Sequence, residues 1–163
     1  MIHSPTCGHA LRALIYLAEK DDGRPVLIRE IADAAGVPRQ SLAKLLQSLR
    51  NQGLVRSTKG PGGGYRLARP AGEMGVAEVI EAVDGHIDLR ESCVLGLDEC
   101  SDVARCALHD AWMVFREKYD ATIAGMSLLD ASYALRRKQV AHLAREAPTP
   151  DVALGLQRGT QEE

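Results

Sequence analysis

Three cysteines and one histidine lie close together in the second half of this 163-residue chain. Cys93, Cys100, Cys106 and His109 are separated by six, five and two residues, and the loop that carries them is rich in Gly, Asp and Ser. Residues three apart share one face of a helix, so Cys106 and His109 are expected to point toward a common centre that the loop thiols also reach. Three thiolates and one imidazole can complete a four-coordinate metal site.

The spacing of these cysteines helps to identify the metal. Zinc would accept the donor set, but its structural sites usually contain ligand pairs with two to four residues between them, and none of these cysteine gaps is that short. Widely spaced thiolates on a loop suit an iron-sulfur cluster, whose irons lie further apart than the ligands of one ion. We therefore expect a cluster, with a thiol redox switch or a zinc site as the alternative. Simple burial of the thiols as small apolar groups is disfavoured by the polarity of the loop.

The N-terminal part of the chain predicts a helix-turn-helix arrangement. Apolar residues recur every three to four positions up to Lys20, from Leu27 to Ala35, and from Pro38 until Gly53 ends the pattern. Gly36 marks a tight turn between the second and third helices. The third helix carries polar and basic residues on the face away from its leucines, which is typical of a helix that lies in the major groove. An ordinary antiparallel helix pair is the alternative.

A short β-hairpin is expected directly after this helix. Leu54 to Ser57 and Tyr65 to Leu67 read as strands, and residues 59–64, KGPGGG, read as the tip between them. Glycines at such a tip let the backbone lie against a sugar-phosphate surface. Between Arg39 and Arg69 there are seven basic residues and no Asp or Glu, so a cationic surface is predicted although the net charge of the chain is −2.

Together these elements predict a winged helix-turn-helix surface that binds DNA. Residues of the third helix should reach base edges, whereas those of the hairpin should contact phosphates or the minor groove. The candidate DNA-binding residues are Arg39, Gln40, Ser41, Lys44, Arg56, Lys59, Gly62, Gly63 and Arg66.

Composition excludes several other classes of protein. Apolar residues make up 45% and charged residues 26%, and no apolar stretch approaches the roughly 20 residues that cross a bilayer. We expect no secretory signal, no membrane association and a cytoplasmic location. No nucleophile with a nearby base, no paired catalytic carboxylates and no nucleotide-binding loop are evident, so we expect neither an enzyme nor a small-molecule substrate.

The chain resembles the Rrf-type family of bacterial winged-helix regulators that carry iron-sulfur clusters. The matching segments are ALRALIYLA at Ala10–Ala18, residues 28–55, KGPGGGYRLARP at Lys59–Pro70, and the cysteine stretch. The resemblance implies a homodimer that reads a palindromic operator, with a long helix after the cluster loop that crosses the partner subunit. An apolar stripe suited to that helix consists of Leu108, Trp112, Phe115, Tyr119 and Ile123.

Comparison with this family also concerns the fourth ligand and the operator. His109 stands at the spacing of the cluster-assembly regulators, which implies a 2Fe-2S cluster with three Cys ligands and one His ligand. Gly8 stands where the nitric-oxide sensors have an Asp ligand, yet Cys7 and His9 flank it and could ligate a 4Fe-4S cluster instead. Ala43 replaces an acidic base-reading residue of the cluster-assembly regulators, so a different operator is expected.

The expected fold is mainly α-helical, with a winged helix-turn-helix domain, a two-stranded wing and a long dimerisation helix. Ser127 and Asp130 predict a capping box at the start of a last helix that runs to about Glu146. The expected boundaries are residues 1–70 for the winged helix-turn-helix domain, 71–110 for the connecting helix and cluster-binding loop, 107–147 for the dimerisation helices, and 148–163 for a disordered tail.

Overall fold

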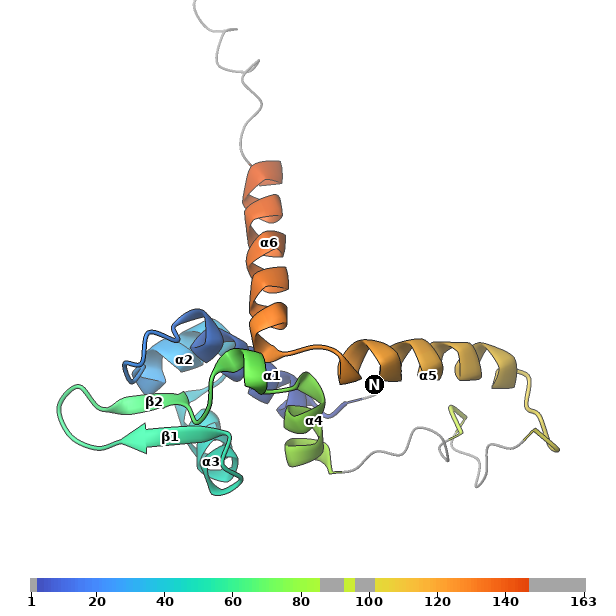
Figure 1. The fold of residues 1–163 in the computed structure, drawn as a ribbon, viewed down its shortest axis with the longest axis horizontal. Helices are drawn as coiled ribbons and strands as arrows, with labels where there is room; N and C mark the ends of the chain where they lie inside the picture. The colour runs from blue at the N-terminus through green and yellow to red at the C-terminus, as the bar shows by residue number, and fades with distance from the viewer. Residues whose placement is uncertain (1–2, 86–92, 96–101, 147–163) are drawn as a thin grey trace, which may run out of the picture. The chain divides into compact units, whose positions relative to one another are not determined.

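A computed structural model describes residues 3–85, 93–95 and 102–146 of the chain (Figure 1). Cys100 and the predicted tail at 148–163 lie outside the described residues. The chain divides into two units, Met1–Ser132 and Tyr133–Glu163, and the first contains the elements discussed below up to the beginning of the last helix. No helix in the described parts is both long and apolar enough to cross a membrane. The expected domain boundaries remain a prediction.

Three helices form the core of the first unit, α1 (Pro5–Glu19), α2 (Ile28–Ala35) and α3 (Arg39–Asn51). α1 begins at Pro5 because proline lacks the N–H that the first turn leaves unpaired, and because the Ser4 hydroxyl accepts a hydrogen bond from the Cys7 N–H at 3.0 Å. The Arg12 guanidinium donates to the Ala35 carbonyl at 2.7 Å and so holds α1 against the end of α2.

The turn between α2 and α3 has the form that the sequence predicts. Gly36 adopts the left-handed conformation, with φ of 64°, which a glycine reaches without steric cost. Pro38 then lies just before α3 as its N-cap. The predicted leucine stripe of α3 is fully or almost fully buried, and it consists of Leu42, Leu45, Leu46 and Leu49.

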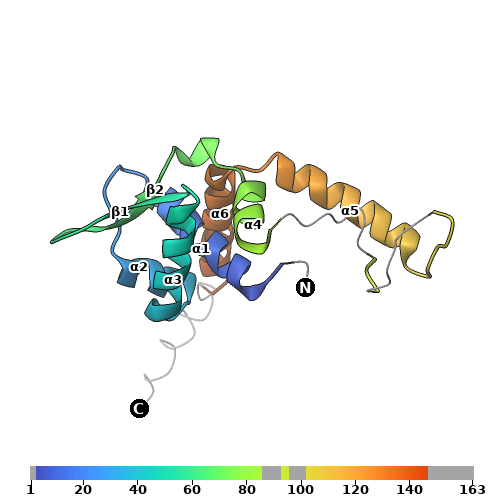
Figure 2. The ribbon, with the colours of Figure 1, turned by 90° about the horizontal axis from the view of Figure 1, so that it is seen from below.

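Strands β1 (Val55–Thr58) and β2 (Gly64–Leu67) pair antiparallel, each about one residue away from the predicted strand. In both views this hairpin projects from the packed helices α1, α2 and α3 (Figure 1, Figure 2). Val26 forms an additional bridge to β2, because its N–H donates to the Tyr65 carbonyl and its carbonyl accepts from the Tyr65 N–H, both at 2.8 Å. The wing is therefore attached to the segment that leads into α2.

A 3-10 turn, η1 (Ala71–Glu73), leads from the wing to α4 (Val76–Asp84). Val79 is fully buried, and the Gln52 side-chain amide, just after α3, donates to the Ala82 carbonyl at 2.7 Å. α4 thus contacts the residue that follows α3 and packs against α1.

Two longer helices follow, α5 (His109–Ala124) and α6 (Leu128–Glu146). The predicted capping box is present, because the Ser127 N–H donates to Asp130 Oδ2 and the Asp130 N–H donates to Ser127 Oγ, each at 3.1 Å. The start of α6 is fixed to the segment before α4, since the Leu128 N–H donates to the Met74 carbonyl at 2.8 Å.

Candidate nucleic-acid interface and metal centre

The exposed face of α3 carries the side chains that were expected to read bases. Arg39, Gln40, Ser41 and Lys44 are all exposed, opposite the buried leucines of the same helix. α3 also contacts β1, so its polar face and the wing belong to one packed body. This is the arrangement of a helix that enters a groove while a wing contacts the neighbouring backbone.

The wing presents a pair of opposed arginines. Arg56 of β1 and Arg66 of β2 are direct cross-strand partners, and both are exposed. Lys59 is exposed at the tip between the strands. Three cations therefore lie along one hairpin, which gives it a strong attraction for a polyanion.

Arg69 differs from the other basic residues of this region. Its guanidinium forms a salt bridge with the Glu78 carboxylate of α4, a contact that sequence spacing did not suggest. Arg50, at the end of α3, is directed toward the wing, and its Nη1 donates to Ser57 Oγ at 3.3 Å. The cationic surface is therefore centred on α3 and the wing rather than on all seven basic residues.

The four wing glycines serve two structural purposes. Gly60 and Gly62 have φ of 95° and 74°, which side chains other than glycine rarely adopt. At Gly63 and Gly64 an added Cβ would lie 2.3 Å from the Thr58 carbonyl oxygen and 2.2 Å from the Val26 carbonyl oxygen. Folding of the wing alone therefore requires glycine at these two positions. Close DNA contact is therefore not needed to explain the glycine at position 63, and its contact with phosphate remains a prediction.

His9 lines a surface pocket between α1 and α3, together with Ser41, Lys44 and Ser48. Cys7, two residues earlier, is fully buried against the core. Among the described residues, neither is part of a group of three metal-ligand atoms with Cys93 or Cys106.

The predicted metal-ligand segment is described at three of its four positions. Cys93 and Cys106 are both half-buried, and Cys100 lies outside the described residues. The expectation that Cys106 and His109 share a helical face is wrong, because α5 begins only at His109 and Cys106 lies in the turn before it. A turn still links them, since the His109 N–H donates to the Cys106 carbonyl at 3.1 Å.

His109 is the most informative of these residues. It is 3% exposed, the one buried residue along α5, and its Nε2 lies 3.3 Å from Asp102 Oδ1. Asp102 is itself held by the Arg105 guanidinium at 2.9 Å. A histidine held through one ring nitrogen by a carboxylate is typical of a metal ligand, whose other nitrogen faces the metal. The described side chains of Cys93, Cys106 and His109 do not form a closed group of ligand atoms, but cysteine sulfurs and a buried imidazole are the donors that a thiolate-bound cluster requires.

Comparison with known proteins identifies relatives of the whole chain rather than of single residues. The Rrf2 family, described as an iron-dependent transcriptional regulator, matches residues 4–133. The HTH-type transcriptional regulator IscR of Xenorhabdus nematophila is 36% identical over 120 residues, which cover 74% of this chain and 72% of that protein. A putative HTH-type transcriptional regulator of Mycobacterium tuberculosis is 35% identical over 136 residues, which cover 83% of this chain and 84% of that protein.

Solved structures show the same fold. The structure of CymR, the global cysteine regulator of B. subtilis, has a TM-score of 0.65 and 25% identity, and the match covers 80% of this chain and 95% of that chain. T. potens IscR has a TM-score of 0.59 and 22% identity, over 90% of this chain and 92% of that chain. The relatives named here are transcriptional regulators rather than enzymes, and the winged-helix fold expected from the sequence is confirmed. The chain belongs to the Rrf2 family of DNA-binding transcriptional regulators.

Proposed function

We propose that this regulator represses transcription by binding a palindromic operator as a homodimer, and that an iron-sulfur cluster controls its affinity for the operator. The exposed basic surface of α3 and the wing is the observation that carries the DNA-binding part. In this surface the α3 side chains read bases and the wing cations fix the protein on the phosphates. This surface is well suited to DNA because the polar side chains of α3 are exposed, while the leucines of the same helix are buried in the core.

The exposed apolar side chains of α5 support the homodimer. Trp112, Phe115 and Tyr119 stack in series, with ring centroids 5.5 and 5.8 Å apart, and Phe115 is 41% exposed. Leu108 is 46% exposed at the start of the same helix. A helix that leaves aromatic side chains exposed in this way commonly packs against a partner. Two copies paired along α5 would present two copies of α3 to the two halves of a palindrome.

The cluster is proposed to be held by Cys93, Cys100, Cys106 and His109, with a 2Fe-2S form preferred. A bound cluster supplies a centre that responds to iron supply, oxidants or nitric oxide. Asp102 contacts His109 at Nε2, and a carboxylate of this kind commonly orients a ligating histidine. A 4Fe-4S form that uses Cys7 or His9 is the alternative nuclearity.

A connection from the cluster segment to the DNA-reading surface runs through α4. The segment that carries Cys93 follows directly after α4, and α4 is tied to the end of α3 by the hydrogen bond from Gln52 to Ala82. Ordering or release of the cluster segment could therefore change the placement of α3. A dimer responds strongly to such a change because both copies of α3 must fit half-sites at a fixed separation.

Anaerobic purification followed by operator titration tests this proposal. We expect brown protein that contains iron and sulfide, with visible absorption that disappears with a chelator or oxidant. Holo and apo protein should differ in operator affinity by tenfold or more, or about 1.4 kcal/mol. Colourless protein whose operator binding responds to thiol oxidation would instead support the cluster-free alternative, a thiol redox switch. Colourless protein that retains zinc in the loop would support the structural zinc site.

A further inference from the structure

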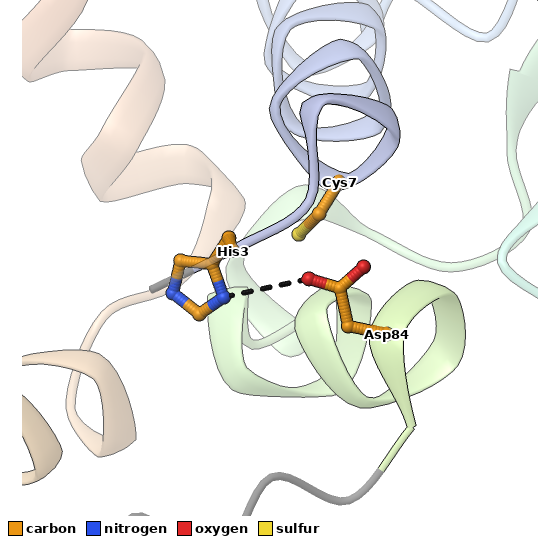
Figure 3. Close-up of side chains that lie close together, drawn as sticks. All are labelled: His3, Cys7 and Asp84. Carbon is orange, nitrogen blue, oxygen red and sulfur yellow. Dashed lines mark ion pairs between the residues drawn. The ribbon is translucent and has the colours of Figure 1, made fainter. Parts of the chain in front are cut away.

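A second group of metal-binding side chains lies apart from the Cys93–His109 segment. His3 precedes α1, Cys7 belongs to the first turn of α1, and Asp84 is the last residue of α4. One ligand atom from each of these residues lies within 4.8 Å of the other two, and Figure 3 shows the three side chains directed toward one another. A sulfur, an imidazole nitrogen and a carboxylate oxygen therefore converge on one point.

The three side chains are shielded from solvent to different degrees. Cys7 is fully buried, and the side chains of Asp84 and His3 are 8% and 22% exposed. The Nδ1 atom of His3 is buried without a hydrogen-bond partner among the described residues, and its ion pair with Asp84 Oδ2 measures 3.6 Å, too long for a hydrogen bond. A buried nitrogen without a partner is rare in native proteins, and a metal ion would satisfy it.

The remaining polar atoms of these ligands are already held in place. His3 Nε2 hydrogen-bonds the Tyr119 hydroxyl of α5, which leaves Nδ1 as the nitrogen directed at Asp84. The Ser4 N–H donates to Asp84 Oδ2 at 2.9 Å, and the Ser4 hydroxyl donates to Asp84 Oδ1 at 2.5 Å. Ligating histidines and carboxylates are commonly oriented by such outer hydrogen bonds.

The environment of Cys7 and Asp84 shifts the pKa of each group. Burial and the nearby Asp84 carboxylate raise the pKa of the Cys7 thiol to about 11. Burial alone would raise the pKa of Asp84, but the hydrogen bonds from Ser4 outweigh it and lower this pKa below its ordinary value.

We propose that His3, Cys7 and Asp84 form a mononuclear Zn²⁺ site that is independent of the iron-sulfur ligands. A thiolate selects a borderline ion such as Zn²⁺ over Mg²⁺ or Ca²⁺, which require oxygen ligands. On binding, the Cys7 S–H bond breaks, the thiolate binds zinc and the proton passes to solvent. Three protein ligands leave the fourth tetrahedral position for water or an added ligand.

This site would join the beginning of α1 to the end of α4, with α5 linked to it through Tyr119. Asp84 lies only nine residues before Cys93 in the sequence. Zinc bound here would stabilise the folded protein, and it would hold in place the end of α4, from which the segment with the cluster ligands starts. The proposal does not depend on that segment holding a cluster.

Cobalt binding to the full-length protein tests the site. Replacement of the three other cysteines, Cys93→Ser, Cys100→Ser and Cys106→Ser, leaves Cys7 as the remaining thiol. We expect one Co²⁺ per chain with a thiolate-to-cobalt charge-transfer band, displaced by one equivalent of Zn²⁺. In this background Cys7→Ser should abolish the band, and His3→Ala and Asp84→Asn should each weaken metal affinity by at least tenfold.

Matched variants serve as controls for these substitutions. Asp33→Asn on α2 and His142→Ala on α6 make the same chemical changes at exposed positions, and both should leave the cobalt spectrum unchanged. If Asp84→Asn unfolds the protein, as circular dichroism would show, His3→Ala decides the matter, because His3 lies outside the helices. A charge-transfer band that survives Cys7→Ser, or an unchanged cobalt affinity in His3→Ala, would overturn the proposal, as would cobalt binding without thiolate character.

A last measurement separates this site from the cluster. With the other three cysteines intact, Cys7→Ser protein purified anaerobically should keep the visible absorption of the cluster while it loses zinc. Loss of the cluster absorption in this variant would make Cys7 a cluster ligand and would overturn the independent zinc site. Protein that is colourless both with and without Cys7 but still binds zinc through Cys7 would support the zinc site and refute the cluster instead.

Discussion

Arg56 and Arg66 lie directly opposite each other on the two strands of the wing, and both side chains are exposed. Like charges at directly opposed positions destabilise a sheet, by about 0.2–1 kcal/mol for a typical cross-strand pair. In the free protein, the pair therefore does not stabilise this hairpin of two four-residue strands. The pair is favourable when a polyanion lies against it, as DNA does in the proposed complex.

The first prediction therefore separates wing stability from DNA affinity. Arg56→Gln should leave the thermal unfolding temperature unchanged or slightly higher, because it removes the like-charge pair. The same variant should bind DNA more weakly, with the slope of log affinity against log salt reduced by about one unit. Arg137→Gln on α6 is the matched control and should alter neither quantity. Calorimetry and gel-shift titrations at several salt concentrations measure both effects, and a large fall in stability would show that the pair is not repulsive.

The second prediction distinguishes contacts that position the protein from contacts that read sequence. Lys59→Ala, at the wing tip, should weaken binding to every DNA sequence by a similar factor. Gln40→Ala, on the exposed face of α3, should chiefly reduce discrimination at one operator position, by about 1–3 kcal/mol. Titrations against an operator series with single base changes compare the two variants. An unchanged affinity and salt slope for Lys59→Ala would remove the wing from the interface.

The third prediction concerns two wing glycines that serve different purposes. Gly62→Ala forces alanine into a left-handed backbone conformation, although there is open space around its Cβ. The free energy of unfolding should fall by about 1–2 kcal/mol. Gly64→Ala should cost more, because its Cβ would lie 2.2 Å from the Val26 carbonyl oxygen and displace the bridge to Tyr65. Urea unfolding gives both free energies. Equal losses at the two positions would contradict the difference in their surroundings.

Local patterns in the sequence were sufficient for much of this fold. The leucine spacing of α3, Gly36 in the turn before it and the Ser127–Asp130 capping box depend on residues within one or two helical turns of each other. Their structural consequences were therefore predicted correctly. The position of Cys106 was not, because ligand spacing does not say where a helix begins.

Contacts between distant segments were beyond the reach of sequence patterns. Ser4 and Asp84 are 80 residues apart, and only the packing of α1 against α4 brings them together. The same holds for Gly64, whose close approach to Val26 cannot be predicted from its place among the other glycines of the wing tip. The position of His3 in the sequence likewise gives no sign that it lies beside Cys7 and Asp84.

The fourth prediction concerns the pH dependence of the capping box at α6. Side-chain and backbone hydrogen bonds from Ser127 lower the pKa of Asp130 below its ordinary value of 3.8. A lowered pKa stabilises the folded state above the unfolded pKa, and this contribution is lost as the pH falls through the folded value. Ser127→Ala should thus be less stable than the wild type at about pH 7, and the difference should shrink at about pH 3. Urea unfolding at the two pH values measures it, and a constant difference would show that the Asp130 charge is not involved.

The fifth prediction identifies the fourth ligand of the proposed cluster. Thiolates bind iron more strongly than an imidazole does, so alanine at Cys93, Cys100 or Cys106 should give colourless or unstable protein. His109→Ala should hold an altered and labile cluster, whereas His109→Cys should retain a cluster with a lower reduction potential, because histidine in place of cysteine raises that potential. Asp102→Asn should keep the cluster but loosen it, since the amide still orients the ring while the negative charge is lost.

Cys7→Ala provides the decisive comparison for that prediction. Cys7 is fully buried beside Asp84, so its replacement should leave the visible spectrum of the cluster unchanged while His109→Ala changes it. Both variants are to be purified side by side under anaerobic conditions, and iron and sulfide are to be measured together with the spectra. If His109→Ala kept the wild-type spectrum and Cys7→Ala lost it, the fourth ligand would come from the N-terminal segment. The assignment of a 2Fe-2S cluster held by three cysteines and His109 would then have to be abandoned, because His109 would not be a cluster ligand.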